Sequence, residues 1–153
     1  MAIPFRHAGQ QLLVQPQLRG RIHGIDAVKQ SNSDELGPID GLSVLTGNDE
    51  DYLRALELGL DGLISVAAHV AGREMRRMFD EPEHRAEIDA SLQDIYATLF
   101  CTASPIPVKA ALNMLGHDVG GLRLPLVEAS DEKRELVQAM LERHGLLSGA
   151  HTA

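Results

Sequence analysis

The chain has 153 residues, of which 44% are hydrophobic and 24% are charged, as expected for one globular domain of ordinary size. The formal net charge of −8 and the lack of a basic patch argue against a nucleic-acid partner. No apolar run reaches the roughly 18 residues that a membrane span needs. Cys101 has no second cysteine to pair with, and the first residues show no signal-peptide pattern, so we expect a cytoplasmic protein.

The first half of the chain alternates between short apolar runs and helical patterns. Strands are predicted over Ile25–Lys29, Leu42–Thr46 and Leu63–Ala67, where β-prone residues end at polar or turn positions. A short helix is predicted over 31–36, and a longer one from position 48 or 49 to 58, with leucines at helical spacing. This alternation with short connections predicts parallel strands joined by right-handed crossovers.

After Ala68 the pattern changes, because no further strand is predicted. Four helices are expected there, over 71–79, 85–101, 107–115 and 131–144. Three parallel strands are too few for a closed barrel of eight βα units, which takes about 250 residues. The fold class is therefore α/β: the C-terminal part of a TIM (β/α)8 barrel in residues 1–80, followed by a helical C-terminal segment in residues 81–153. Such a half-barrel leaves strand edges and apolar surface open, so we expect a homo-oligomer.

Three motifs carry a resemblance to a known family. The first is Leu-Thr-Gly-Asn-Asp at 45–49, followed by Gly-Leu-Ile-Ser-Val-Ala-Ala-His-Val at 62–70. The second is Ser-Pro-Ile-Pro-Val-Lys-Ala-Ala-Leu at 104–112, and the third is Leu-Arg-Leu-Pro-Leu at 122–126. Together and in this order they resemble the dihydrodipicolinate synthase family, within the superfamily shared with N-acetylneuraminate lyase. The resemblance covers nearly the whole chain but only the C-terminal half of the family's length.

The resemblance implies a set of site residues. Lys29 matches the lysine that forms a Schiff base with pyruvate in this family, and Arg6 matches an arginine near the carboxylate of the second substrate. Gly47 and Ile64 match backbone positions that line the pyruvate site. The implied activity is a class I aldolase-type lyase that condenses pyruvate with aspartate semialdehyde in lysine and diaminopimelate biosynthesis, without a cofactor. A neutral lysine amine is the nucleophile that this chemistry needs.

Two departures from the family pattern concern the start of the chain. Met1 falls where the family has its catalytic tyrosine, 28 residues before Lys29. The first barrel strands and the paired-threonine motif that holds the pyruvate carboxylate would lie before Met1. We therefore expect a truncation or a misplaced start, and an isolated chain with little synthase activity, because general acid–base groups typically contribute about 10²–10⁴-fold.

Each candidate residue also has an ordinary structural explanation. Lys29 could be a solvated lysine after a strand, and Arg6 could be an exposed arginine near a chain end. Gly47 could serve only a turn, and Ile64 only the core. Asn48 and Asp49 could each be a helix cap or an element of the site. The seven histidines show no metal-ligand spacing, and no P-loop or Gly-rich nucleotide motif is present, so no metal or nucleotide cofactor is predicted.

Three functions remain open at this point. The first is a dihydrodipicolinate synthase represented by its C-terminal half. The second is a related pyruvate-dependent aldolase, such as an N-acetylneuraminate or keto-deoxy-sugar lyase. The third is a non-catalytic remnant or oligomerisation module. Arg6 and the Pro-Ile-Pro and Leu-Arg-Leu-Pro-Leu segments favour the first, with pyruvate and an aldehyde as substrates, whereas Met1 favours the third for the isolated chain.

Overall fold

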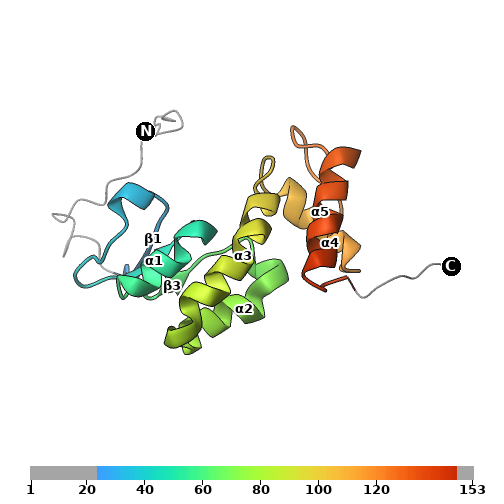
Figure 1. Cartoon of the computed structure of the whole chain (residues 1–153). Helices are drawn as coiled ribbons and strands as arrows, with labels where there is room; N and C mark the ends of the chain where they lie inside the picture. Colours follow the sequence, from blue (N-terminus) through green and yellow to red (C-terminus); the bar gives the residue numbers. More distant parts are fainter. Residues whose placement is uncertain (1–23, 148–153) are drawn as a thin grey trace, which may run out of the picture.

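The computed structural model describes residues 24–147. It contains a parallel three-stranded sheet in the order β1-β2-β3, formed by β1 (Ala27–Gln30), β2 (Ser43–Thr46) and β3 (Gly62–Leu63). The parallel pairing confirms the arrangement that the alternating pattern predicted. Figure 1 shows the sheet and α1 (Tyr52–Glu57) on one side of the central helices.

The two faces of the sheet differ because successive side chains of a strand point to opposite sides. Val28 and Val44 point to the covered face, where they pack with Leu36, Ala55 and Leu60. These last three come from the segment after β1, from α1 and from the turn before β3. The neighbouring residues in β1 and β2 therefore point to the other face of the sheet.

Four longer helices follow the sheet. They are α2 (Ala68–Asp80), α3 (Arg85–Leu99), α4 (Ile106–Met114) and α5 (Asp131–Arg143). α2 and α3 pack against each other, and α4 and α5 pack on their far side from the sheet (Figure 1). All four lie within two or three residues of the predicted ranges. Short 3-10 turns η2 (Ser33–Glu35), η3 (Asp49–Asp51) and η4 (Pro82–His84) precede or join the helices.

The main apolar core lies between the helices. Its most buried members include Leu92 and Leu99 of α3 and Val137 and Leu141 of α5, all at most 1% exposed. Tyr52 of α1 belongs to the same cluster, so the core joins the end of the sheet region to the helical segment. The division of the chain at residue 80 stays a prediction.

The third strand is shorter than the sequence predicted. Only Gly62 and Leu63 pair with β2, and Ile64 adds one backbone hydrogen bond to Thr46. Beyond that point the N–H groups of Val66 and Ala67 donate to the side chain of Asp49. A side chain has taken the place of a neighbouring strand, so the ladder ends before residues 65–67.

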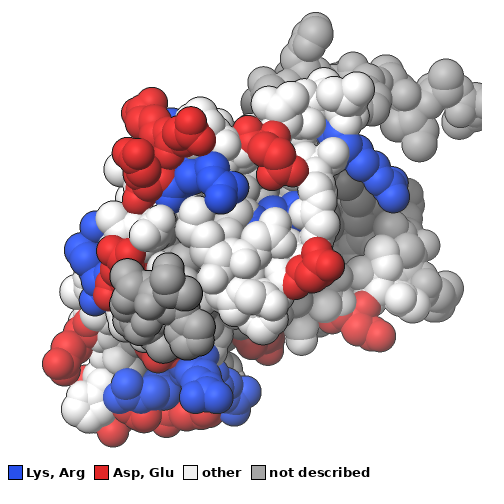
Figure 2. Space-filling model, turned by 90° about the vertical axis from the view of Figure 1, so that its right-hand side faces the viewer, with Lys and Arg blue, Asp and Glu red and all other residues white. Residues whose placement is uncertain are grey.

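Charged side chains are interspersed on the face of the molecule drawn in Figure 2, where acidic and basic groups surround an uncharged area. Charged side chains one helical turn apart also form ion pairs, such as Arg76 with Asp80 and Arg77 with Glu81, each at i and i+4. None of the helices in residues 24–147 is long and apolar enough to cross a membrane.

Candidate active site at the carboxyl ends of the strands

Three of the four predicted site residues lie at one edge of the sheet. Lys29 is near the end of β1, Gly47 follows β2 and Ile64 follows β3. Backbone hydrogen bonds align this edge: Gly47 N–H donates to the Gln30 carbonyl at 2.8 Å, and Ile64 N–H donates to the Thr46 carbonyl at 2.9 Å. Because β2 lies between β1 and β3, Lys29 and Ile64 are about two strand spacings, or ~10 Å, apart. Arg6 lies outside the described residues.

Lys29 and Gly47 are in direct contact. A Cβ at position 47 would overlap Cε of Lys29 and Oγ of Ser31, and would lie 3.2 Å from Cγ of Lys29. The lysine stem therefore occupies the space that any other residue at 47 would fill. Glycine at 47 lets the Lys29 and Ser31 side chains take these positions, and its backbone is not left-handed, because its φ lies outside that region.

The lysine faces the open side of the sheet. Val28 packs into the covered face, so Lys29, the next residue, points to the opposite face, where its register partner is Leu45 of β2. Ile64 is 50% exposed at the same edge, although it is a large aliphatic residue. An accessible amine and an accessible apolar side chain on one edge are features of a ligand site more than of a core.

The buried Asp49 side chain supports the segment that follows β3. Its carboxylate is 2% exposed and accepts hydrogen bonds from the Ser65 hydroxyl and from the N–H groups of Val66 and Ala67, both at 3.2 Å. It thereby fixes the segment that carries Ile64. Asn48 does occupy the N-cap position of η3, as predicted, but its side chain makes no capping hydrogen bond there. The Asp49 carboxylate binds residues 65–67 instead.

Asn48 connects the segments that follow β1 and β2. Its amide nitrogen Nδ2 donates to the Ser31 carbonyl at 3.1 Å, to Ser33 Oγ at 3.3 Å and to Asp51 Oδ2 at 2.9 Å. Ser33 also donates to Asp51 Oδ2 at 2.5 Å, and Arg54 Nη1 donates to the Ser33 carbonyl at 2.7 Å. The turn after Lys29 is thus held by side chains from the start of α1.

A cavity of about 240 Å³ lies beside this edge. It is lined by Gly47, Asn48, Asp49, Glu50, Tyr96 and Phe100. Burial raises the pKa of the Tyr96 phenol well above its ordinary value, and the charges of Asp89 and Asp49 raise it further, so Tyr96 is neutral at physiological pH. Phe100, 49% exposed, offers an apolar wall next to the polar backbone of 47–50. The cavity has the mixed lining of a small-molecule site.

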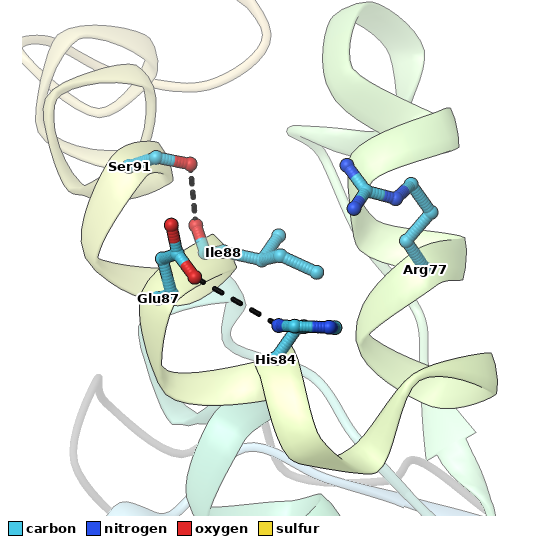
Figure 3. Close-up of a pocket in the computed structure, with 5 residues that line it drawn as sticks. All are labelled: Arg77, His84, Glu87, Ile88 and Ser91. Atoms are coloured by element: carbon cyan, nitrogen blue, oxygen red, sulfur yellow. Dashed lines mark hydrogen bonds and ion pairs between the residues drawn. The ribbon is translucent and has the colours of Figure 1, made fainter.

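A second hollow, of about 360 Å³, lies between α2 and the start of α3 (Figure 3). In Figure 3, Arg77 faces His84 and Ile88 across it, but the polar groups are engaged locally. Arg77 pairs with Glu81, His84 lies 3.8 Å from Glu87, and Ser91 donates to the Ile88 carbonyl. No residue of the Lys29 edge lines this hollow, and we assign it no chemistry.

The chain contains three lysines, and the other two have different surroundings. Lys109 of α4 donates to the Gly121 carbonyl and so ties the loop after α4 to the helix. Lys133 of α5 lies 3.8 Å from Glu132. Neither is at the end of a strand. Within residues 24–147, no group of three or more His, Cys, Asp or Glu side chains could hold a metal ion.

The comparisons with known proteins agree with this geometry. The model of the dihydrodipicolinate synthetase family matches residues 10–144. The chain belongs to this family. The 4-hydroxy-tetrahydrodipicolinate synthase of Heliobacterium modesticaldum is 41% identical over 108 residues, covering 67% of this chain and 36% of that protein.

Solved structures of dihydrodipicolinate synthases also match. The enzyme from Thermotoga maritima has a TM-score of 0.80 and 31% identity, covering 86% of this chain and 50% of that one. The chloride-inhibited enzyme from Acinetobacter baumannii, solved in complex with pyruvate, has a TM-score of 0.70 and 29% identity, covering 80% and 46%. The chain thus spans about half, or less, of these relatives, and its fold is the C-terminal part of a dihydrodipicolinate synthase TIM barrel with a helical segment.

The three residues that motif resemblance suggested lie on one edge of the sheet, but sequence reasoning missed the contacts that support this edge. Lys29, Gly47 and Ile64 came from motif resemblance, and the structure brings them together. The contact of Lys29 with Gly47 and the bonds of Asn48 depend on the register of two parallel strands. The polar run Ser-Asn-Ser at 31–33, directly after β1, is a local signal that could have indicated them.

Proposed function

We propose that this chain carries the lysine-bearing half of a dihydrodipicolinate synthase site, and that Lys29 forms a Schiff base with pyruvate. The observation that carries the proposal is the placement of Lys29: an accessible lysine at the carboxyl end of a parallel strand, with its stem lying over Gly47. Active sites of (β/α)8 barrels lie at this end of the strands. Support also comes from the pyruvate complex of the Acinetobacter baumannii enzyme, a structural neighbour.

The chemistry follows from an amine and a ketone. The neutral Lys29 amine attacks the carbonyl carbon of pyruvate, and loss of water gives a protonated imine. The imine nitrogen then draws electrons from the adjacent methyl group, which loses a proton and leaves a nucleophilic enamine. The enamine carbon forms the new C–C bond with the carbonyl carbon of an aldehyde, for which we propose aspartate semialdehyde. Hydrolysis or intramolecular displacement of the imine frees Lys29.

We assign different roles to the residues at this edge. Lys29 supplies the nucleophile, Gly47 leaves room for its stem, and Ile64 provides an apolar side chain beside the site. We propose that the groups binding the pyruvate carboxylate and relaying protons come from the half of the relatives that this chain does not match. The 153-residue chain should accordingly form the imine slowly and catalyse the whole condensation poorly.

Trapping with borohydride tests the assignment. The purified chain is incubated with pyruvate, reduced, digested and mapped by mass spectrometry. One reduced pyruvate adduct on Lys29 is expected, formed faster than on Lys109 or Lys133. Lys29→Arg should abolish that adduct while keeping the charge, and Lys133→Arg, the matched control on α5, should leave it unchanged. Equal labelling of all three lysines, or preferential labelling of Lys109, would show that Lys29 has no special role.

A further inference from the structure

Several side-chain hydrogen bonds fix the segment that follows Lys29. Ser31 to Glu35 leaves β1 and forms the short turn η2, and its polar atoms meet side chains from the loop after β2 and from α1. Gln30 also bonds the Glu35 carbonyl at 2.6 Å and receives the Gly37 N–H at 3.1 Å. Since Lys29 directly precedes this segment, its orientation depends on where the segment is fixed.

Among the described residues, the Asn48 side chain joins three parts of this arrangement: the Ser31 backbone, Ser33 of η2 and Asp51 before α1. Its Nδ2 lies within 3.3 Å of three oxygens: the Ser31 carbonyl, Ser33 Oγ and Asp51 Oδ2. All three can accept, so the position demands a donor. An amide supplies two N–H groups, whereas a carboxylate of the same shape supplies none at neutral pH and would face the Asp51 carboxylate.

The arrangement reaches Lys29 through Gly47. Ser31 Oγ and the Lys29 stem share the space above Gly47, so that a shift of Ser31 changes the room available to the lysine. Asn48 follows Gly47 directly and grips the Ser31 carbonyl. Gly47 leaves this space open, and Asn48, the next residue, fixes Ser31, one of the two residues whose side chains occupy it.

We propose that Asn48 is a positioning residue for Lys29, acting through Ser31 and in partnership with Asp51. This inference rests on the proposed function of Lys29 as the imine-forming amine. Asn48 does not react; its amide, with Asp51 as acceptor, holds the turn that keeps the lysine stem over Gly47. In a nucleophilic step, a displacement of about 1 Å can lower the rate by up to about 10²-fold.

The test exchanges donor and acceptor. Asn48→Asp removes the donors without changing the shape and places a second carboxylate beside Asp51. Adding Asp51→Asn returns one donor and one acceptor to the pair in the opposite order. The matched control is Gln138→Glu on α5, the same amide-to-acid change next to an acid, since Gln138 donates to Glu142 at 2.8 Å.

The first readout is the rate of borohydride-trapped adduct formation at Lys29 over a range of pyruvate concentrations. Asn48→Asp should lower the maximal rate about tenfold with little change in the half-saturating pyruvate concentration, because Asn48 is a positioning group and not a pyruvate ligand. The double variant should recover to within about threefold of the parent, as coupled partners do. Gln138→Glu should match the parent. A parent-like rate in Asn48→Asp, or a double variant no faster than the single one, overturns the proposal.

The second readout does not depend on pyruvate chemistry. The three lysines are reductively methylated with ¹³C, and their methyl signals are recorded by NMR. In Asn48→Asp the Lys29 signal should move, while the Lys109 and Lys133 signals stay; in the double variant the Lys29 signal should move back. An unmoved Lys29 signal overturns the positioning role. If no lysine of the parent forms an adduct, the proposed function fails, and this measurement still decides the role of Asn48.

Discussion

The sheet region and the helical region of this chain are supported in different ways. Among the described residues, the main core between the helices contains 16 buried apolar residues, whereas the cluster under the sheet contains four, namely Leu36, Val44, Ala55 and Leu60. The sheet region relies on polar bonds instead, centred on Asp49 and Asn48. The helices thus contain most of the apolar core, and the thinly packed edge beside them holds Lys29.

This difference suggests how the two regions should respond to substitution. Apolar burial contributes in proportion to area and is spread over many residues, so truncation in the helical core should cost stability without touching Lys29 directly. Directional polar bonds are few and specific, so their loss in the sheet region should alter local geometry more than global stability. Substitutions in the helical core and in the sheet region should separate these two kinds of effect.

The largest loss of stability should come from the helical core. Leu99 is fully buried in α3, and Leu99→Ala should lower the free energy of unfolding by about 2–5 kcal/mol, because a cavity remains. Leu136→Ala on the exposed side of α5 should cost no more than about 0.5 kcal/mol. Urea unfolding followed by circular dichroism measures both. Equal costs would mean that the core between α3 and α5 is not packed as described.

A smaller and more local loss is expected at Asp49. Asp49→Ala leaves the N–H groups of Val66 and Ala67 without their acceptor, at about 1–3 kcal/mol for a buried unsatisfied group. The effect should concentrate near Ile64, so amide exchange in peptides covering 62–68 should accelerate more than in α5. Asp51→Ala removes an acidic side chain that bonds Ser33 and Asn48 instead of residues 65–67, and it should leave exchange at 62–68 unchanged. Uniform acceleration across the chain would contradict a local role.

The smallest expected effect is pH-dependent and lies far from the sheet. Asp94 of α3 bonds Arg143 at 2.9 Å and His144 at 2.5 Å, which joins α3 to the end of α5. Burial tends to raise the pKa of Asp94, but the hydrogen bonds from His144 and Arg143 outweigh it, so the pKa lies below its ordinary value. Asp94 contributes about 0.5–1 kcal/mol to folding stability after allowance for solvent screening. This contribution is present above the unfolded-state pKa of about 3.9.

The sign follows from that lowered pKa. As the pH falls through the folded-state pKa, Asp94 becomes protonated in both states and its contribution disappears. The stability difference between the parent and Asp94→Asn should therefore be present near pH 5 and shrink below about pH 4. Thermal melts between about pH 5 and pH 2 provide the test. A difference that grows below about pH 4 would contradict the direction of the pKa shift.

Local sequence predicted the elements better than it predicted their connections. The strands and helices appeared in the predicted order, because each carries its own apolar period and polar ends. β3 was predicted through Ala67 but ends at Leu63, because a carboxylate 17 residues earlier in the chain binds Val66. Such a bond depends on strand register and leaves no local trace.

In the candidate site, too, sequence predicted the residues better than the contacts between them. Lys29, Gly47 and Ile64 were predicted from motifs, and their common edge follows from parallel order. The close approach of the Lys29 side chain to Gly47 could not be predicted, because it depends on the path of that side chain. Asn48 was considered as a helix cap or a site element, but its bonds to Ser31 and Ser33 could not be predicted, since these partners lie 15 to 17 residues away. Arg6 stays a prediction, as does association of the chain with itself.

Hydrogen–deuterium exchange of the chain, with and without pyruvate and borohydride, tests the central claim that the chemistry lies at the sheet edge and the stability in the helices. Without pyruvate, peptides from α3 and α5 should exchange far more slowly than those from β1 and β3. After trapping, exchange should slow in peptides covering 27–35 and 43–52 and stay unchanged in α5. Protection confined to the helices after trapping, or no change near Lys29, would contradict the account.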